Sequence, residues 1–259
     1  MDFLTTWGFS LAIIVGFMTL IWIVSVVIKN AGIVDIFWGF GFVLVAWVFF
    51  FLTGDVTTKK ILVVSLATLW GLRLTIHIFI RNHGKEEDFR YRNWRSEYGE
   101  HRYWWVSFFQ VFLLQGVLMW LIAAPLLGAQ ISTPAESLSI PDFIALALFI
   151  TGFLFEAGGD YQLTRFKANP ANKGKLLTTG FWKYTRHPNY FGDAVVWWSF
   201  GLFSLSSGFW LPLFSSALMT FLLLRVSGVS LLEKTLVKTK PGYQEYMERA
   251  GSFFPTFWK

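Results

Sequence analysis

The chain has 259 residues, of which 54% are hydrophobic and 20% aromatic, while charged residues make up only 15%. Soluble domains carry about 25% charged residues, so this composition and its long apolar blocks indicate a polytopic membrane protein. The chain has no cysteine, which excludes disulfides, zinc-thiolate sites and cysteine nucleophiles. The net charge of +6 comes from basic residues scattered between apolar blocks, which favours contact with anionic lipid over nucleic-acid binding.

Seven apolar blocks predict membrane-spanning helices over residues 5–28, 33–52, 61–80, 106–127, 143–155, 190–206 and 209–231. The fifth block is short, and we expect its helix to continue through Arg165. The N-terminus lacks a basic segment and a small-residue cleavage site, so no removable signal peptide is expected. The predicted fold is all-α, a single membrane domain over 1–259 in which 1–127 faces the substrate and 141–259 binds the cofactor.

Lysine and arginine concentrate in the 81–103 segment, the 165–188 segment and the C-terminal tail. With seven spans these segments fall on one side, which the positive-inside rule makes cytoplasmic. The N-terminus then faces outward, as does the 129–141 loop, which carries Glu136 and no basic residue. Lys59 and Lys60 depart from this bias. The expected location is the bacterial inner membrane.

The segment 180–193, GFWKYTRHPNYFGD, gathers polar side chains immediately before the sixth apolar block. Polar and ionisable groups at a membrane edge are costly and usually functional. Its candidates are Arg186, His187, Asn189, Tyr190 and Asp193. A positive strip at a helix N-terminus suits a cofactor that bears phosphate or carboxylate.

Other polar residues interrupt the apolar blocks: Asp35, Arg73, His77, Gln110, Gln115, Glu156, Asp160 and Arg225. Each of them could simply satisfy an interhelical hydrogen bond or extend to the membrane surface. Both charge signs occur in several blocks, however, which favours a shared polar cavity open to the cytoplasm. Trp38 and Trp70 stand beside these positions, where they could line a hydrophobic ligand's pocket or belong to an interfacial belt.

Motifs of soluble enzymes are absent. The sequence has no glycine-rich dinucleotide fingerprint, no Walker loop and no nucleophile elbow. His83, His101 and His187 lack metal-ligand spacing, so no metal site is expected. A bound nucleotide would therefore have to be held by side chains between helices.

The motifs VDIFWG, WGLRL, RHPNYFGD and LLEK resemble those of steroid 5-alpha-reductase-like membrane proteins, in an uncharacterised bacterial branch. The resemblance spans nearly the whole chain and is strongest from Gly152 onward. It implies a seven-helix membrane enzyme that uses NADPH to reduce a carbon–carbon double bond conjugated to a ketone, in a hydrophobic lipid or steroid-like substrate.

The resemblance also implies cofactor-binding positions. Asn189 and Asp193 match an Asn and an acidic residue that hold the cofactor, and Asp160 with Lys167 matches a second acidic position followed by a basic one. Arg73 matches a cationic helix position. Tyr243, Tyr246 and Pro255 match the C-terminal signature. We expect the cofactor site to include Arg73, Asp160, Lys167, Arg186, His187, Asn189, Tyr190, Asp193, Arg225, Tyr243 and Tyr246.

The catalytic side of the resemblance is incomplete. Steroid reductases polarise the ketone with a Gln-Glu pair on the second span and a Tyr on the third, but residues 33–52 contain no such pair and Trp70 occupies the Tyr position. We expect Asp35, protonated in a dry site, to replace the acid, with Trp70 and His77 beside it.

Two other classes stay open. RHPxYxG followed by an E-x-Y-x-x-Y tail also resembles isoprenylcysteine and phospholipid methyltransferases, which use S-adenosylmethionine, although their usual paired glutamates are reduced here to Glu233. A non-catalytic lipid-binding or transport protein would need the polar residues only to hold helices together. The sequence indicates neither the substrate nor the oligomeric state.

Overall fold

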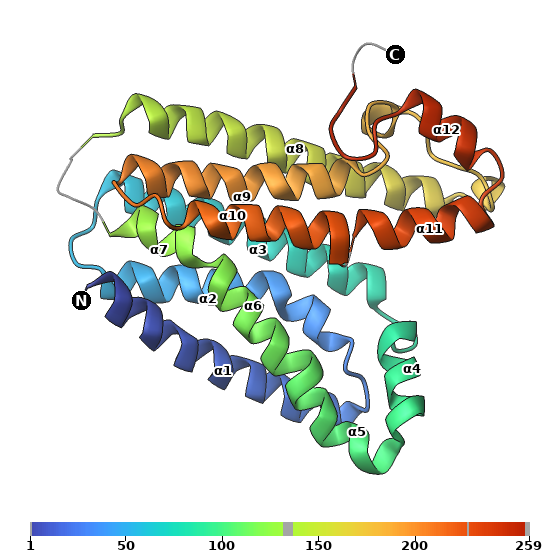
Figure 1. The fold of residues 1–259 in the computed structure, drawn as a ribbon, viewed down its shortest axis with the longest axis horizontal. Helices are drawn as coiled ribbons and strands as arrows, with labels where there is room; N and C mark the ends of the chain where they lie inside the picture. The colour runs from blue at the N-terminus through green and yellow to red at the C-terminus, as the bar shows by residue number, and fades with distance from the viewer. Residues whose placement is uncertain (1, 132–136, 227, 257–259) are drawn as a thin grey trace. The chain divides into compact units, whose positions relative to one another are not determined.

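The computed structural model describes residues 2–131, 137–226 and 228–256. It is 79% helical, without strands in the part described, so the predicted all-α class is confirmed (Figure 1). Glu136 of the predicted outward loop and Lys259 of the tail lie outside the described residues. The chain divides into two compact units. The first runs to Leu138 and includes Ser207–Phe209, and the second comprises Ser139–Ser206 and the chain from Trp210 onward.

The first unit begins with three long helices, α1 (Phe3–Ile28), α2 (Ile33–Leu52) and α3 (Thr58–Asn82). Side-chain caps fix two of the starts. Asp2 Oδ1 accepts from Thr5 N at 2.9 Å, and Thr57 Oγ1 accepts from Lys60 N at 3.3 Å. These oxygens satisfy N–H groups that have no partner within a helix, which explains where the helices begin.

A second group of helices completes the first unit: α4 (Phe89–Tyr98), α5 (Glu100–Ser107), η1 (Phe108–Leu113), α6 (Leu114–Ile122) and α7 (Ala124–Gln130). The segment η1 is a π-helix, and Gln110 lies within it. Such π turns insert into α-helices and recur at functional sites. The predicted fourth span is therefore a longer, irregular helical rod from Glu100 to Gln130.

The second unit begins with α8 (Ile140–Ala168), which extends through Arg165 as predicted. Two short turns, η2 (Pro170–Asn172) and η3 (Gly180–Lys183), lead to α9 (Pro188–Ser206). The remaining elements are α10 (Leu213–Phe221), η4 (Leu222–Val226), α11 (Val229–Thr239) and α12 (Tyr243–Arg249).

Five helical segments among the described residues are long and apolar enough to cross a membrane: α1, α2, α3, Glu100–Gln130 and α8. The predicted sixth span is the 19-residue helix α9, about 28 Å long at 1.5 Å per residue. Its Trp, Ser, Asn and Asp residues lower its hydropathy. The predicted seventh span contains the shorter apolar helix Leu213–Val226. Membrane-spanning character is thus supported, while the count of seven stays a prediction.

In the first unit, α2 and α3 pack closely through glycine. A Cβ added to Gly71 would lie 2.6 Å from both Gly39 O and Val43 Cγ2, so only glycine permits this approach. The corresponding neighbours of Gly39 are Gly71, Leu74 and Thr75, which shows that the two helices run antiparallel. Asp35, one turn before Gly39, therefore lies near the level of Thr75.

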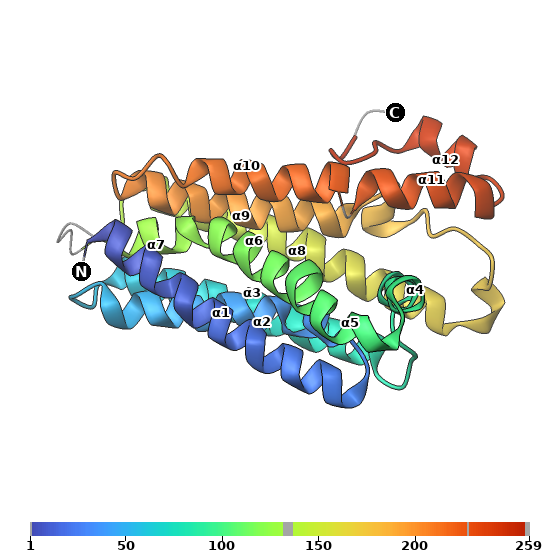
Figure 2. The same cartoon turned by 60° about the horizontal axis from the view of Figure 1, so that its bottom comes forward.

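In the second unit, α8 and α9 lie side by side along most of their length (Figures 1 and 2). A Cβ added to Gly152 would lie 2.6 Å from Gly192 O and 2.8 Å from Val196 N. Next to this contact, Glu156 is buried with 3% exposure. The close backbone approach fixes the first turns of α9 against the middle of α8, next to the candidate polar residues.

Candidate functional sites

In the second unit, Arg186 ties the segment just before α9 to the C-terminal part of the chain. Its Nε donates to Glu233 Oε1 at 2.8 Å, and its Nη1 donates to Met247 O at 3.1 Å and Ala250 O at 2.6 Å. Its backbone N also donates to Gly251 O at 2.9 Å. Arg186 is only 6% exposed, so its charge and donors are satisfied largely within the protein.

Glu233 on α11 is the centre of this network. Its Oε1 also accepts from Ser252 Oγ at 3.0 Å and lies 3.4 Å from His187 Nε2. Burial alone would raise the pKa of the Glu233 carboxyl, but the neighbouring His187 and Arg186 lower it to about 2. Glu233 is therefore a carboxylate at neutral pH, held by a basic pair from the RHP motif.

His187 is 3% exposed and stacks on Tyr190, with ring centroids 5.7 Å apart and planes 7° apart. Its Nε2 is buried and has no well-aligned hydrogen-bond partner among the residues that the structure describes. This nitrogen lies 3.4 Å from Glu233 Oε1, so it faces the carboxylate at the centre of the same network.

Asn189 joins α9 to α8. Its Nδ2 donates to Asp160 Oδ1 at 3.0 Å, and Asp160 is 8% exposed. Asp193, one turn later on α9, is 9% exposed. The structure thus brings Asn189 and Asp160, which lie 29 positions apart in sequence, into direct contact at the α8–α9 interface. This pairing joins two of the positions that the sequence selected separately.

The remaining cofactor candidates of the second unit are less closely grouped. Lys167 is exposed near the end of α8, and Arg225 is exposed in η4. Tyr243 and Tyr246 on α12 are buried with Ala250 in a small core, and the Tyr246 hydroxyl donates to Trp182 O. The two tyrosines therefore stabilise the packing of α12, and their role toward a cofactor stays a prediction.

In the first unit, Asp35 is the centre of a second polar network. Its Oδ2 accepts from Arg90 Nη2 at 2.8 Å, and its Oδ1 accepts from the Tyr91 hydroxyl at 2.7 Å. Gln115 Nε2 lies 3.3 Å from the Tyr91 hydroxyl and donates to it. The network joins α2, α4 and α6.

The α4 groups of this network have shifted pKa values. Burial opposes the positive charge of Arg90, but the hydrogen bond to Asp88 and the charge of Asp35 raise its pKa well above the ordinary value. Burial, followed by the nearby Asp35 charge, raises the pKa of the Tyr91 hydroxyl. Arg90 is therefore charged and Tyr91 neutral near pH 7, which leaves both as hydrogen-bond donors.

The α3 candidates do not all join Asp35. Trp70 is fully buried, and its ring meets Phe42 edge-on at 5.7 Å. Phe42 is seven residues beyond Asp35, about 10 Å along α2, so Trp70 belongs to the core between α2 and α3. Arg73 and His77 are half-buried on α3, on either side of the level of Asp35.

Sequence reasoning missed Arg90 and Tyr91 as partners of Asp35. Asp88 accepts from Arg90 N at 3.0 Å and thereby caps α4, which fixes the two donors in the first turn. The sequence signal for this pair is Asp-x-Arg-Tyr in the basic 81–103 segment, with Asp88 as the cap and the next two polar residues as donors. Among the described residues, no group of three His, Cys, Asp or Glu side chains could hold a metal ion.

Comparison with known proteins gives one long and several short similarities. An uncharacterised protein of Schizosaccharomyces pombe is 28% identical over 281 residues, which cover 96% of this chain and 78% of the relative. The delta(14)-sterol reductase of Ascobolus immersus is 36% identical over 81 residues, covering 26% of this chain and 18% of the enzyme.

The delta(14)-sterol reductase of Arabidopsis thaliana is 30% identical over 102 residues, 35% of this chain and 28% of the enzyme. The matches thus cover less than a third of these sterol reductases. No solved structure matches the chain. A family profile, in contrast, matches residues 21–250, so the chain belongs to the family described as a protein of unknown function, DUF1295.

Proposed function

We propose that the protein is a membrane-bound, NADPH-dependent reductase of a carbon–carbon double bond in a hydrophobic, sterol-like or other lipid-like enone. The observation that carries the proposal is the contact between Asn189 and Asp160 beside the buried Arg186 and His187 and their partner Glu233. Local similarity to delta(14)-sterol reductases supports the reaction class.

The second unit fits a dinucleotide in chemical terms. Residues 166–186 contain five basic residues, Lys167, Lys173, Lys175, Lys183 and Arg186, and no acidic one. Lysine and arginine are the usual partners of phosphate. Asp160 and Asp193 are acceptors for ribose hydroxyls or a carboxamide.

When bound, NADPH would supply a hydride to the electrophilic carbon. Asn189 and Asp160 would orient the nucleotide, and exposed lysines such as Lys167 would meet its phosphates. We propose that at least one of Arg73, Lys167 and Arg186 contacts a phosphate. For Arg186 the existing bonds to Glu233 and Ala250 O favour positioning of the α9 turn. Arg225, Tyr190, Tyr243 and Tyr246 stay candidates for the same site.

The first unit supports the substrate side of the proposal. Asp35 accepts hydrogen bonds from two α4 side chains, Arg90 and Tyr91, and its protonation, expected from the sequence, stays a prediction. We therefore propose that Asp35 positions Arg90 and Tyr91, with Arg73 and His77 on the neighbouring α3. Charged groups of this kind can stabilise negative charge on a substrate oxygen in a site that excludes water.

The topology in this proposal has seven spans, with α9 and the Leu213–Val226 region added to the five segments above, the N-terminus outside and the C-terminus in the cytoplasm. The Lys and Arg bias of the 81–103 and 165–188 segments supports it. The bacterial inner membrane stays the predicted location.

Titration of the detergent-purified protein with NADPH, NADH and S-adenosylmethionine tests the function. We expect micromolar or tighter binding of NADPH and weaker binding of NADH, because surplus cations can meet the additional phosphate. Binding of S-adenosylmethionine without either nicotinamide would assign a methyltransferase. Binding of none of the three would favour a non-catalytic lipid-binding protein.

A further inference from the structure

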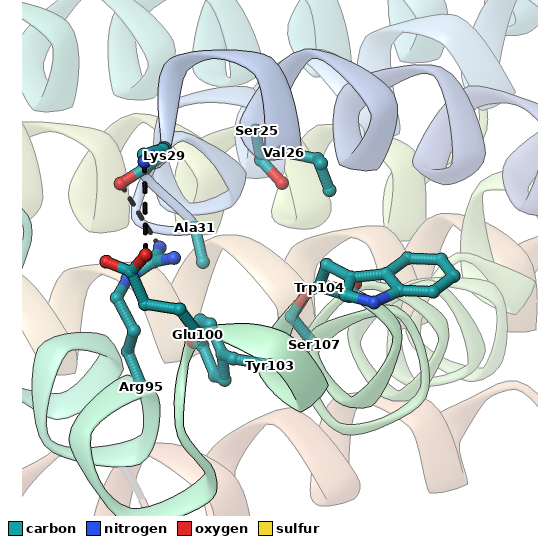
Figure 3. A pocket seen from close by; sticks show the side chains of 9 residues that line it. All are labelled: Ser25, Val26, Lys29, Ala31, Arg95, Glu100, Tyr103, Trp104 and Ser107. Carbon is teal, nitrogen blue, oxygen red and sulfur yellow. Dashed lines mark hydrogen bonds and ion pairs between the residues drawn. The ribbon is translucent and has the colours of Figure 1, made fainter.

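A small polar pocket lies in the first unit, where the end of α1 meets the start of α5 (Figure 3). It encloses about 140 Å³, several times the roughly 30 Å³ that a water molecule occupies in the liquid. Polar lining residues include Lys29, Arg95, Glu100 and Tyr103. Both helices belong to candidate membrane spans, and the pocket lies at the end of one span and the start of the other.

One buried group in the pocket lacks a partner. Tyr103 is 1% exposed, and its hydroxyl has no hydrogen-bond partner among the described residues. Its ring is held from one side by the Arg95 guanidinium, 4.6 Å from the ring centroid. A buried hydroxyl without a hydrogen-bond partner lowers the stability of the fold. A ligand oxygen that accepts its hydrogen bond would remove this cost, so the hydroxyl indicates a hydrogen-bonding ligand.

The charges around the pocket are balanced. Arg95 is neutralised by Glu87, whose two oxygens lie 2.9 and 3.0 Å from it. Lys29 Nζ and Glu100 Oε2 are 4.0 Å apart, and both side chains are more than 70% exposed. Such a pair contributes little stability, so each partner can instead face an opposite charge on a ligand. A ligand with one negative and one positive group matches this arrangement.

An apolar groove of about 250 Å³ lies beside the pocket, along α1, α5 and η1. Thr19, Trp22, Trp104, Trp105, Phe108 and Phe109 line it. Trp104 lines both spaces, and its carbonyl accepts from Trp22 Nε1 at 2.8 Å, which fixes the wall between them. The groove can take a hydrocarbon chain whose polar end enters the pocket.

We propose that this pocket and groove bind one zwitterionic phospholipid with an ethanolamine headgroup. The Tyr103 hydroxyl and Lys29 meet the phosphate, Glu100 accepts hydrogen bonds from the ammonium, and an acyl chain occupies the groove beside Trp104. Phosphatidylglycerol has the same phosphate but no ammonium to pair with Glu100, and a choline headgroup has no N–H to donate to it. The lining residues of the site include none of the Asp35 network.

Native mass spectrometry of the full chain, released from nanodiscs that contain phosphatidylethanolamine, phosphatidylglycerol and phosphatidylcholine, tests the proposal. We expect one retained phosphatidylethanolamine per chain. Tyr103→Phe and Glu100→Gln should each lower its affinity about tenfold, the loss expected for one charge-assisted hydrogen bond. The matched controls Tyr98→Phe and Glu97→Gln, on α4, should stay within about twofold of the parent protein.

A second arm separates the lipid from its free headgroup. Glycerophosphoethanolamine, which lacks acyl chains, should fail to displace the lipid. Phe109→Ala, in the groove, should weaken lipid retention more than the control Phe51→Ala, which removes an exposed ring on α2. Thermal unfolding verifies that each variant is folded. The proposal is overturned by absence of retained phospholipid, equal retention of the three lipids, displacement by the chain-free headgroup, or equal effects of pocket and control variants.

Discussion

Arg186 and Glu233 form an enclosed ion pair in the second unit, with Arg186 Nη2 2.7 Å and Nε 2.8 Å from Glu233 Oε1. Their side chains are 6% and 18% exposed. The pair joins the residue just before α9 to α11, while Arg186 Nη1 reaches the carbonyl of Ala250 beyond α12. One side chain thus connects the RHP motif to the C-terminal part of the chain.

Glu233→Gln should destabilise the protein by about 2–3 kcal/mol at pH 7, because it leaves the buried Arg186 without its counter-charge. Glu245→Gln, on the exposed face of α12, is the control and should change stability by less than about 0.5 kcal/mol. Thermal unfolding in detergent measures both. Equal stability of the two variants would show that the ion pair is not a stabilising contact.

The same pair predicts a pH dependence. The folded pKa of Glu233, about 2, is below the ordinary value of 4.5. The carboxylate's contribution is therefore fully present above about pH 4.5 and is lost as the pH falls toward 2. The difference in melting temperature between the parent protein and Glu233→Gln should shrink from pH 6 to pH 3. A difference that is constant over this range would contradict the assignment.

Gly192→Ala should destabilise the second unit by about 1–3 kcal/mol, because the added methyl group would meet Glu156 N and Gly152 O across the α8–α9 contact. Gly16→Ala on α1 is a matched control, since its added Cβ has no neighbour within 4 Å. Alanine also favours a helix over glycine by about 1 kcal/mol, so the control should be neutral or stabilising. Similar melting temperatures for both variants would refute the close packing.

Much of the fold could be predicted because hydrophobic blocks and helix signals are local. Residues 33–52 were predicted as a helix, and α2 has these bounds. The continuation of α8 through Arg165 was also predicted. The fourth block was harder, because the π-helix Phe108–Leu113 and the break after Ile122 depend on how neighbouring helices pack.

The sequence predicted which residues belong to the candidate sites better than it predicted their contacts. Asn189 and Asp160 were both selected, yet their contact depends on how α9 packs against α8. Asp35 was selected, but its donors Arg90 and Tyr91 lie 55 and 56 positions later, in a loop whose course no local pattern specifies. The buried Tyr103 hydroxyl without a hydrogen-bond partner could not be predicted from the sequence, because burial and pairing depend on how the helices pack.

Tyr91→Phe should cost about 1–2 kcal/mol of stability, because Asp35 loses one of its two donors and Gln115 loses an acceptor. If the proposed reductase reaction is present, turnover should also fall about tenfold or more while NADPH affinity changes by less than about twofold. Tyr98→Phe on the same helix is the control. A parallel loss of cofactor affinity would place Tyr91 with the cofactor instead.

Reporter fusions after Leu52, Asn82, Ala129 and Lys173 should report outside, inside, outside and inside in turn. The expectation follows from the basic segments 81–103 and 165–188, which the positive-inside rule places in the cytoplasm. A fusion after Ser206 should again report outside, which tests whether α9 crosses the membrane. A cytoplasmic signal after Ala129 or Ser206 would rule out the seven-span topology.

Asn189→Ala and Asp193→Ala should each abolish detectable NADPH binding with little loss of folded protein. Both residues lie in the first two turns of α9, and Asn189 reaches Asp160 on α8 at 3.0 Å. Replacement by alanine removes polar groups without placing new atoms in the α8–α9 contact, so the fold should tolerate it. Calorimetric titration measures the affinity, thermal unfolding verifies the fold, and Asn93→Ala on the exposed side of α4 is the matched control.

Asp160→Asn should weaken NADPH binding by a smaller factor, because the amide keeps one oxygen acceptor. Unchanged NADPH affinity in all three variants would show that the Asn189–Asp160 pair only joins α8 to α9, and the cofactor assignment would then fail.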